Sequence, residues 1–210
     1  MSTPADGDAA PTVGRALASR RMCRDFTDRP VTPVVLDPVL DAAFAGPRAG
    51  NTHGLHLVVL RGPDVARYWD VTLPEPRRST FRWPGLLRAP VLVLVVVDPQ
   101  AYVERYAAAD KASTGLGRES ADWPVPYWFV DGGAAVMGLL LAAEAAGLGA
   151  LFFGQFDHES AVAAEFGVPD RCRSVGTVAL GWPAPGGREP ARSAATGRPG
   201  GPGFVHEGGW

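Results

Sequence analysis

The longest run of apolar and small residues in the chain lies between two acidic positions, Asp131 and Glu144. Within it, every side of a 3.6-residue helical period is apolar or small, which predicts a helix that is buried all round. We expect Asp131 in the first turn, where a carboxylate accepts hydrogen bonds from free N–H groups, and Gly147 at the helix end. Residues 150–153 then predict a short buried strand that stops at Gly154.

The rest of the chain alternates between shorter segments of helical and of strand periodicity. Residues 91–97 form the strongest predicted strand, because leucine and valine occupy the whole segment. Residues 111–126 predict a long lid or binding loop, and residues 77–90 predict an irregular surface stretch. The other predicted elements are helices at about 13–23, 33–45, 101–109 and 158–166, strands at 55–60 and 174–181, and a loop or short helix at 64–69.

The two ends of the chain differ in composition from its middle. Residues 1–12 are small, polar and proline-containing, and they predict a flexible N-terminal tail. Residues 13–210 are expected to form a single domain. Its last part, from about residue 183 to 210, is a glycine-rich and proline-rich extension, which we expect to lie on another surface because it ends in Trp210.

Charge and cysteine content exclude several classes of function. The net charge of -2 on 210 residues offers no general attraction to nucleic acid or to anionic lipid. The amino terminus lacks the basic and apolar regions of an export signal, and the central apolar run is shorter than the roughly 20 residues of a membrane span. Cys23 and Cys172 have no metal-like spacing and are typical of reduced thiols, so we expect a cytoplasmic protein.

Some polar residues carry groups that could bind a flat, phosphate-bearing ligand. Arg20, Arg21 and Arg24 form a basic group, and the planar guanidinium binds phosphate oxygens in pairs. Asn51 offers an amide donor and acceptor in a turn, and Gly154 allows the backbone to approach a ligand closely. A solvated helix end and a turn cap are the alternatives, and the apolar stretch around Gly154 is by periodicity alone only a core.

Two other motifs are candidates for a metal site and for a dinucleotide-binding site, and neither is predicted to be one. The pair His53 and His56 has no evident third ligand, so no metal is expected. Gly147, Gly149 and Gly154 resemble a dinucleotide fingerprint, but the order here is helix then strand, whereas that fingerprint needs strand then helix.

Taken in order along the chain, four segments resemble the nitroreductase-like FMN flavoproteins. Residues 20–26 read RRMCRDF and are similar to the family's RRSxRxF opening, and residues 45–57 read AGPRAGNTHGLHL and resemble its APSAGNxQxWxF segment. Residues 131–156 resemble the family's DxxxAxxxLLLAAxxxGLGxxxxGxF helix and strand. Residues 178–183, VALGWP, are similar to its late strand end, and Arg198 falls where the family has a final arginine.

The resemblance implies an α+β fold with a central, mainly antiparallel sheet flanked by helices, and a homodimer with two FMN sites at the interface. It implies that the flavin carries the redox step, so no catalytic side chain is expected. By their place in the sequence, aromatic residues of the 111–126 loop and the start of the following helix are expected to line an aromatic substrate pocket over the flavin, or equally to pack a dimer interface. The implied cofactor-binding residues are Arg20, Arg21, Met22, Arg24, Asn51, His53, Phe153, Gly154, Gln155 and Arg198, and the candidate pocket residues are Trp123, Tyr127 and Trp128.

The sequence also departs from the family pattern, and this affects the expected function. Met22 replaces a common serine, His53 a glutamine, Leu55 a tryptophan and Thr196 a lysine, so polar contacts to FMN are lost. The predicted function is hydride transfer from NADH or NADPH, through FMN, to an electron-poor aromatic, nitro or quinone-like molecule. The alternatives are an FMN-dependent tailoring dehydrogenase and a flavin-sequestering protein with little turnover.

Overall fold

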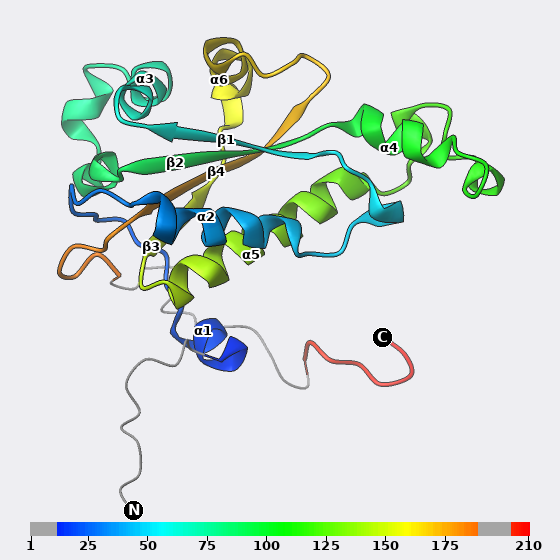
Figure 1. Ribbon diagram of the computed structural model, residues 1–210, viewed down its shortest axis with the longest axis horizontal. Helices are drawn as coiled ribbons and strands as arrows, with labels where there is room; N and C mark the ends of the chain where they lie inside the picture. The colour runs from blue at the N-terminus through cyan, green and yellow to red at the C-terminus, as the bar shows by residue number, and fades with distance from the viewer. Residues whose placement is uncertain (1–11, 189–202) are drawn as a thin grey trace, which may run out of the picture.

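A four-stranded antiparallel sheet forms the middle layer of the protein. The computed structural model describes residues 12–188 and 203–210. The strand order is β1-β2-β4-β3, and the strands span Leu55–Arg61 (β1), Val91–Val97 (β2), Gly149–Phe153 (β3) and Arg173–Gly181 (β4). Helices cover both faces of this sheet (Figure 1). The expected α+β architecture with a central antiparallel sheet is therefore confirmed.

The sheet separates two hydrophobic clusters. Strand β2 is buried along its whole length, because its successive side chains point alternately into the two clusters. Val93 and Val95 face the cluster under α5, whereas Leu92 and Leu94 face the cluster under α3 and α6. A strand buried on both faces needs a continuous apolar run, which is the pattern that predicted it.

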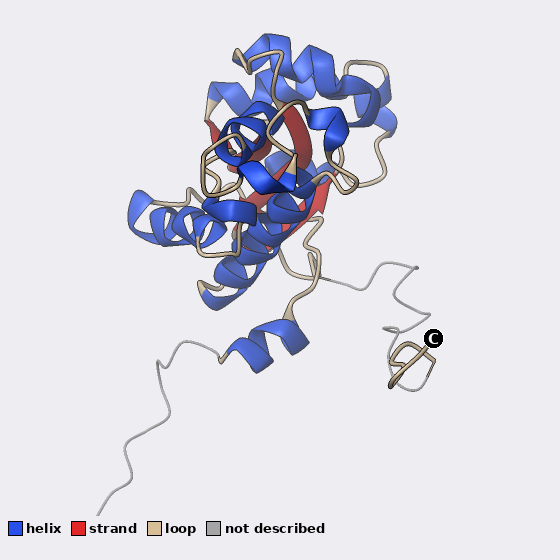
Figure 2. Cartoon of the chain, turned by 90° about the vertical axis from the view of Figure 1, so that its right-hand side faces the viewer, coloured by secondary structure: helices blue, strands red, loops and turns tan. Residues whose placement is uncertain are grey.

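The helices divide into two layers, one on each side of the sheet, as Figure 1 and Figure 2 show. Helices α3 and α6 lie over one face, and α2 and α5 lie under the other. The bounds of the α-helices are Val13–Ser19 (α1), Pro33–Asp41 (α2), Pro63–Thr72 (α3), Pro99–Tyr106 (α4), Tyr127–Ala145 (α5) and Glu159–Phe166 (α6). Short 3-10 helices include Ala42–Phe44 (η1), Ala49–Asn51 (η2), Arg77–Thr80 (η3) and Pro84–Arg88 (η4).

Helix α5 differs from its prediction at its start and at its outer face. It begins four residues early, at Tyr127, so Asp131 lies inside the helix and not in its first turn. Its outer side is also not buried within one chain, since Val130 is 52% exposed and Gly133 is exposed. The helix end agrees with the prediction, because Gly147 has a φ of 73° and Leu148 N–H donates to the carbonyl of Ala143, as in a Schellman motif.

Helix α5 is also the one described helix long and apolar enough to cross a membrane by length and composition. It packs against the sheet and α2, and such a core helix passes the same length and composition test as a span. Helix α1 ends at Ser19, earlier than the expected residue 23, and contacts the end of α5 through a 2.8 Å hydrogen bond from Ser19 to Glu144. Residues 1–11 of the expected N-terminal tail and residues 189–202 of the expected C-terminal extension lie outside the described residues.

Candidate active site

A pocket of about 360 Å³ opens at the carboxyl end of β3. We call it the Arg24 pocket, after the cation in its wall. Phe153, Gly154 and Gln155 form one side of it, as the end of the strand. The sequence prediction placed these three residues and Arg24 in one binding site, and the structure brings them together in this pocket.

Arg24 reaches the pocket because the chain before it pairs with β3. The backbone N–H of Cys23 donates to the carbonyl of Ala150 at 2.9 Å, beside a bridge between Met22 and Ala150. The guanidinium of Arg24 then lies over the ring of Trp83, 5.6 Å from its centroid, and its Nη1 donates to the Met22 carbonyl at 3.4 Å. No described carboxylate forms an ion pair with Arg24, so its positive charge faces the pocket uncompensated.

Aromatic rings from α3 and from the segment before β2 complete the wall. The rings of Trp69 and Phe153 stack with centroids 6.0 Å apart and an interplanar angle of 11°, and the ring of Tyr68 meets that of Trp69 edge-on at 5.1 Å. Phe81 and Trp83 add a second edge-to-face pair. A pocket with flat apolar walls and a guanidinium that pairs with no described carboxylate suits a planar aromatic ligand that carries negative charge.

A buried polar network holds the turn after β3. The side-chain amide of Gln155 donates to the hydroxyl of Thr177 at 3.1 Å, and that hydroxyl also bonds the Tyr68 hydroxyl at 2.9 Å. Burial raises the pKa of Tyr68 to about 12, so the phenol stays neutral at physiological pH. Gly176, with a φ of 146°, precedes Thr177 at an irregularity in the β2–β4 register, where an added Cβ would collide with Phe152.

A second polar centre lies around Asn51, and we call residues 48–51 the Asn51 turn. Gly50 and Asn51 both have positive φ, of 61° and 54°, and the Asn51 side-chain oxygen accepts from Arg48 at 3.3 Å. The backbone N–H of Ala49 donates to Asp131 at 2.9 Å. Asp131 therefore ties this turn to α5, which explains why a carboxylate is buried inside an apolar helix.

Tyr102 strengthens this anchor from α4. Its hydroxyl donates to the same oxygen of Asp131 at 2.8 Å, and burial raises the pKa of Tyr102, so it remains a donor. Arg105 donates from Nε to the Gly50 carbonyl at 2.8 Å. The turn is held by its backbone, while the Asn51 side chain stays exposed.

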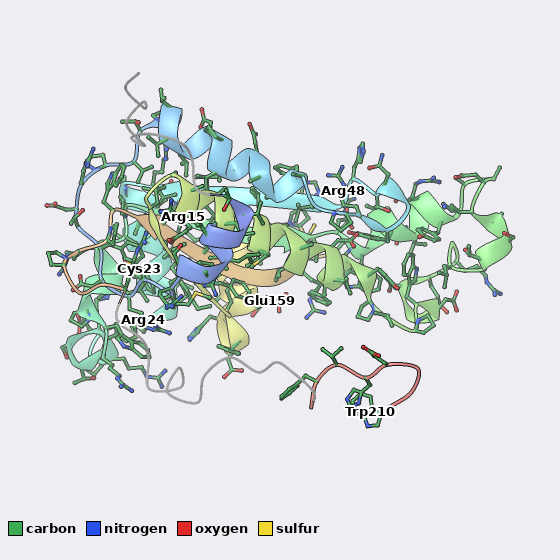
Figure 3. The ribbon with its side chains drawn as sticks, turned by 90° about the horizontal axis from the view of Figure 1, so that it is seen from below. Arg15, Cys23, Arg24, Arg48, Glu159 and Trp210 are labelled. Carbon is green, nitrogen blue, oxygen red and sulfur yellow. The ribbon has the colours of Figure 1, made fainter. Side chains whose placement is uncertain are left out.

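The Arg24 pocket and the Asn51 turn do not meet within one chain. None of the residues 48–51 lines the Arg24 pocket, and Figure 3 shows Arg24 and Arg48 well apart. His53 follows the turn and is also exposed. The two parts of the predicted cofactor site are thus each formed but separate.

The remaining predicted residues take other positions. The guanidinium of Arg21 folds back onto the carbonyls of Ala18 and Arg20, at 2.7 and 3.0 Å, and is exposed. Arg20 is partly buried at the end of α1. Of the N-terminal arginine group, Arg24 alone lines the pocket in the part of the chain described, and Arg198 lies outside the described residues.

Two of the three candidate pocket residues, Trp123 and Trp128, lie in the hydrophobic core and do not line the Arg24 pocket. Trp123 and Trp128 are each 7% exposed, and Trp123 packs edge-on against Tyr106 at 4.6 Å. The indole N–H of Trp123 donates to the Leu116 carbonyl at 3.0 Å, which folds the long loop onto α4 and α5. A tryptophan ring can be buried when its N–H has a hydrogen-bond acceptor, and the Trp123 indole meets this condition. Tyr127 remains 44% exposed beside them.

Sequence reasoning missed the other half of the pocket. Tyr68, Trp69 and Thr72 belong to α3, in a stretch expected as a loop or short helix, and Phe81 and Trp83 lie in the stretch expected to be irregular surface. The concentration of rings between residues 68 and 83 was a usable signal, because large aromatic residues in turn-rich segments pack against something. Thr177 was a second signal, as a polar residue within an apolar strand.

Comparison with known proteins identifies the family of the chain. The family model described as the nitroreductase family matches residues 17–182. This chain belongs to the nitroreductase family.

Other proteins are similar to this chain in sequence or in fold. A candidate NADH dehydrogenase/NAD(P)H nitroreductase from Methanothermobacter thermautotrophicus is 27% identical over 180 residues, which cover 83% of this chain and 80% of that protein. A nitroreductase family protein from Clostridium difficile has a TM-score of 0.65 at 20% identity, with 95% and 99% of the two chains covered. A candidate NAD(P)H:FMN oxidoreductase from Staphylococcus epidermidis has a TM-score of 0.63 at 20% identity, covering 89% and 95%.

The range matched by the family model contains residues of both the Arg24 pocket and the Asn51 turn. It stops before Arg198, so the expected late arginine lies outside the family match as well. Among the described residues, no group of three or more histidine, cysteine or acidic side chains is placed to hold a metal ion.

Proposed function

We propose that the protein is an FMN-dependent oxidoreductase that moves hydride from NADH or NADPH to an electron-poor aromatic, nitro or quinone-like acceptor. One observation carries this proposal: the uncompensated cation of Arg24 shares an aromatic pocket with the backbone of Phe153, Gly154 and Gln155. The nicotinamide-linked and FMN-linked names of the similar proteins support it. FMN, when bound, supplies the two-electron redox step.

The residues of the Arg24 pocket fit a flavin by the chemistry of their groups. Trp69 and Phe153 present flat apolar surfaces, and Arg24 offers a fork of donors for an oxygen-rich edge or a phosphate. Gly154 has no Cβ, and the exposed ring of Phe156, which lies against this position, would turn away to let a planar ligand reach the backbone. The Gln155–Thr177–Tyr68 network fixes the turn that carries these groups, so little rearrangement is needed on binding.

We propose further that a second copy of the chain completes the site. The Asn51 side chain is exposed and lies away from the Arg24 pocket of its own chain, so it is available to the pocket of a partner. The outer side of α5 supports this pairing, because it is apolar yet Val130 is 52% exposed. An apolar helix face left open in one chain is typical of a surface that a partner covers.

The first test is the colour of the purified protein. We expect a yellow preparation whose visible spectrum shows bound flavin, and whose heat-released ligand is FMN. Anaerobic NADH or NADPH is then expected to bleach it, and a quinone or nitroaromatic acceptor to restore the colour. A protein that takes up no FMN overturns the flavin proposal. A yellow protein that neither nicotinamide bleaches is instead a storage protein or a substrate dehydrogenase.

The second test is oligomeric state, measured by light scattering on a sizing column. We expect a homodimer, and we expect Val130→Glu to shift the protein to monomer because it places a charge in the apolar contact. Val34→Glu is the matched control, since Val34 is 85% exposed and lies on α2. A monomeric native protein, or equal loss of dimer in both variants, contradicts the proposed interface. No nucleic-acid or membrane partner is proposed, and a cytoplasmic location is expected.

A further inference from the structure

A second and larger pocket lies at the edge of the sheet, near the junction of β1 with α3. Its volume is about 640 Å³, within the range of small-molecule sites. Arg61 and Val91, which pair across β1 and β2, form its inner end, and Gly62 at the start of α3 borders it. Trp69 lines both this pocket and the Arg24 pocket, so the two cavities share a wall. We call this second cavity the Arg61 pocket.

Arg61 carries the uncompensated charge of this cavity. Its only hydrogen bond among the described residues goes from Nη2 to the neutral carbonyl of Val31, at 3.3 Å, and no described carboxylate pairs with it. Its Nε is buried and lacks an acceptor, as does the indole Nε1 of Trp69 on the same wall. Both of these atoms are enclosed by protein, so a ligand in the cavity would meet the outer nitrogens of the guanidinium, of which Nη1 has no acceptor among the described residues.

The other two arginines at the rim are already neutralised. Arg78 donates to Asp70 at 2.8 Å, and Arg88 pairs with Asp25 and donates to the Phe26 carbonyl. Asp28 is exposed at the mouth, where solvent screens its charge. The cavity therefore has about one positive charge to offer, which suits a monoanion better than a phosphate dianion.

The rest of the lining is apolar and would hold the body of a ligand. Val31, Val65, Leu87, Ala89 and Pro90 form this surface together with Trp69. A carboxylate on a compact apolar body matches both parts, because its oxygens accept from the guanidinium fork while its carbon skeleton covers the apolar wall. We infer that the Arg61 pocket is a second ligand site, separate from the Arg24 pocket, for a small apolar carboxylate.

The test is calorimetric titration of the full chain with cyclohexanecarboxylate and with its neutral analogue cyclohexanecarboxamide. The cyclohexane ring is not planar, so this probe suits the Arg61 pocket and not a flat slot between aromatic rings. We expect saturable binding of the carboxylate with one site per chain, and binding of the carboxamide weaker by about tenfold or more. Equal affinity for the two compounds, or no saturable binding of the carboxylate, overturns the inference.

Four variants locate the probe. Arg61→Gln is expected to weaken carboxylate binding about tenfold or more, and Ala66→Phe, which fills the mouth without touching a charge, is expected to block it. Arg77→Gln is the matched control, because Arg77 neighbours Arg78 but is exposed and outside the pocket. Arg24→Gln is expected to leave binding unchanged. Equal losses in Arg61→Gln and Arg77→Gln overturn the site, and so does loss of binding in Arg24→Gln.

The inference stands independently of the flavin proposal. We expect the probe to bind with the same affinity whether or not FMN has been added, since the lining of the two pockets has only Trp69 in common. Displacement of the probe by FMN would assign the Arg61 pocket to the flavin site and overturn its separate role. A protein that binds the carboxylate but no FMN would overturn the proposed function alone.

Discussion

The Arg24 pocket and the Asn51 turn are two parts of one predicted site, yet they are built in different ways. The Arg24 pocket depends on hydrophobic packing, with rings from α3 and the segment before β2 gathered around the end of β3. The Asn51 turn depends on hydrogen bonds, with its backbone tied to Asp131 and Arg105. Packing shapes a cavity for the body of a ligand, whereas the bonded turn presents one polar side chain outward.

This difference explains why a single chain leaves the site divided. The rings form a cavity within one chain, whereas the exposed Asn51 side chain, whose oxygen accepts from Arg48, lies outside that cavity. Helix α5 connects the two parts, because Asp131 holds the turn while the outer face of the same helix is left apolar. The helix thus positions the Asn51 turn, and in the proposed homodimer its outer face would contact the second copy.

The largest expected effect comes from mixing damaged subunits. Arg24→Gln and Asn51→Ala homodimers are each expected to lose most of their bound FMN, while a dimer of one Arg24→Gln chain and one Asn51→Ala chain is expected to regain about half. The mixed dimer has one site with both residues intact, if the two parts come from different chains. Flavin absorbance of dimers purified through two different tags measures this. No recovery would place both parts in one chain.

The next largest effect is expected on the free energy of unfolding, when the carboxylate that anchors the Asn51 turn is removed. Asp131→Ala leaves the Ala49 N–H and the Tyr102 hydroxyl without their acceptor, and we expect a loss of about 2 to 4 kcal/mol in the free energy of unfolding. Asp131→Asn is the matched control, because its amide oxygen still accepts, and about 1 kcal/mol is expected. Urea unfolding followed by circular dichroism provides the measurement. Equal losses in both variants would contradict an acceptor role.

Removal of the positive charge in the Arg24 pocket is expected to weaken FMN binding and to leave the free energy of unfolding unchanged. Arg24→Gln should weaken FMN binding roughly 10- to 100-fold, as expected for hydrogen bonds to a charged group. Arg21→Gln is the control, because the Arg21 guanidinium bonds its own neighbouring carbonyls and is exposed. Equilibrium dialysis of FMN distinguishes them. If both variants keep the native affinity, Arg24 does not contact the flavin.

The polar network behind Gln155 is expected to contribute less. Thr177→Val keeps the shape of the side chain but leaves the Gln155 amide and the Tyr68 hydroxyl without their shared partner. We expect this substitution to lower the free energy of unfolding by about 1 to 2 kcal/mol. Tyr68→Phe removes one of the two bonds and should cost less. A shift of the bound flavin's absorbance in Thr177→Val would show that the network also positions the turn; a stability loss without it would limit the network to folding.

The smallest effect is acid sensitivity on the side of the molecule that carries the Arg24 pocket. Hydrogen bonds from Arg173 lower the pKa of Glu159, which also accepts from the Ser174 N–H on β4. Because the folded pKa is the lower one, this stabilisation is present above the ordinary glutamate pKa and is lost as pH falls through the folded value. We expect Glu159→Gln to lower the free energy of unfolding by less than about 1 kcal/mol at neutral pH. The free energy of unfolding of this variant should also depend less on pH between pH 5 and 3. An unchanged pH profile would contradict this.

Local patterns predicted most of the elements. The strand at residues 91–97 was located to the residue, and β3 and α6 begin within one residue of their predicted starts, because continuous apolar runs and glycine breaks act on near neighbours. The family motifs also selected Arg24 and residues 153–155, which the structure places in one pocket. These features depend on short stretches of sequence whose structural preference changes little with the surrounding fold.

The role of Asp131 shows what local sequence did not reveal. Its position before an apolar run suggested a helix start, but the helix begins earlier and its carboxylate binds a turn 82 positions away in the chain. The same limit applies to Trp123 and Trp128, whose loop context suggested a pocket and whose packing against Tyr102 places them in the core. Burial and hydrogen-bond partners depend on which distant segments meet, and only the folded chain decides that.

The sequence alone thus determined the order of elements, the family and the groups able to bind a flavin, because these follow from periodicity and from residue chemistry. The tertiary structure decided which of those groups share a cavity. It placed Arg24 with the β3 end and separated Asn51 from both. Tyr68 and Trp69 form part of the wall of the Arg24 pocket, and Thr177 forms a hydrogen bond with Tyr68. The tertiary structure also formed the Arg61 pocket, since that cavity depends on the packing of α3 against the edge of β1 and has no signature in any single stretch of sequence.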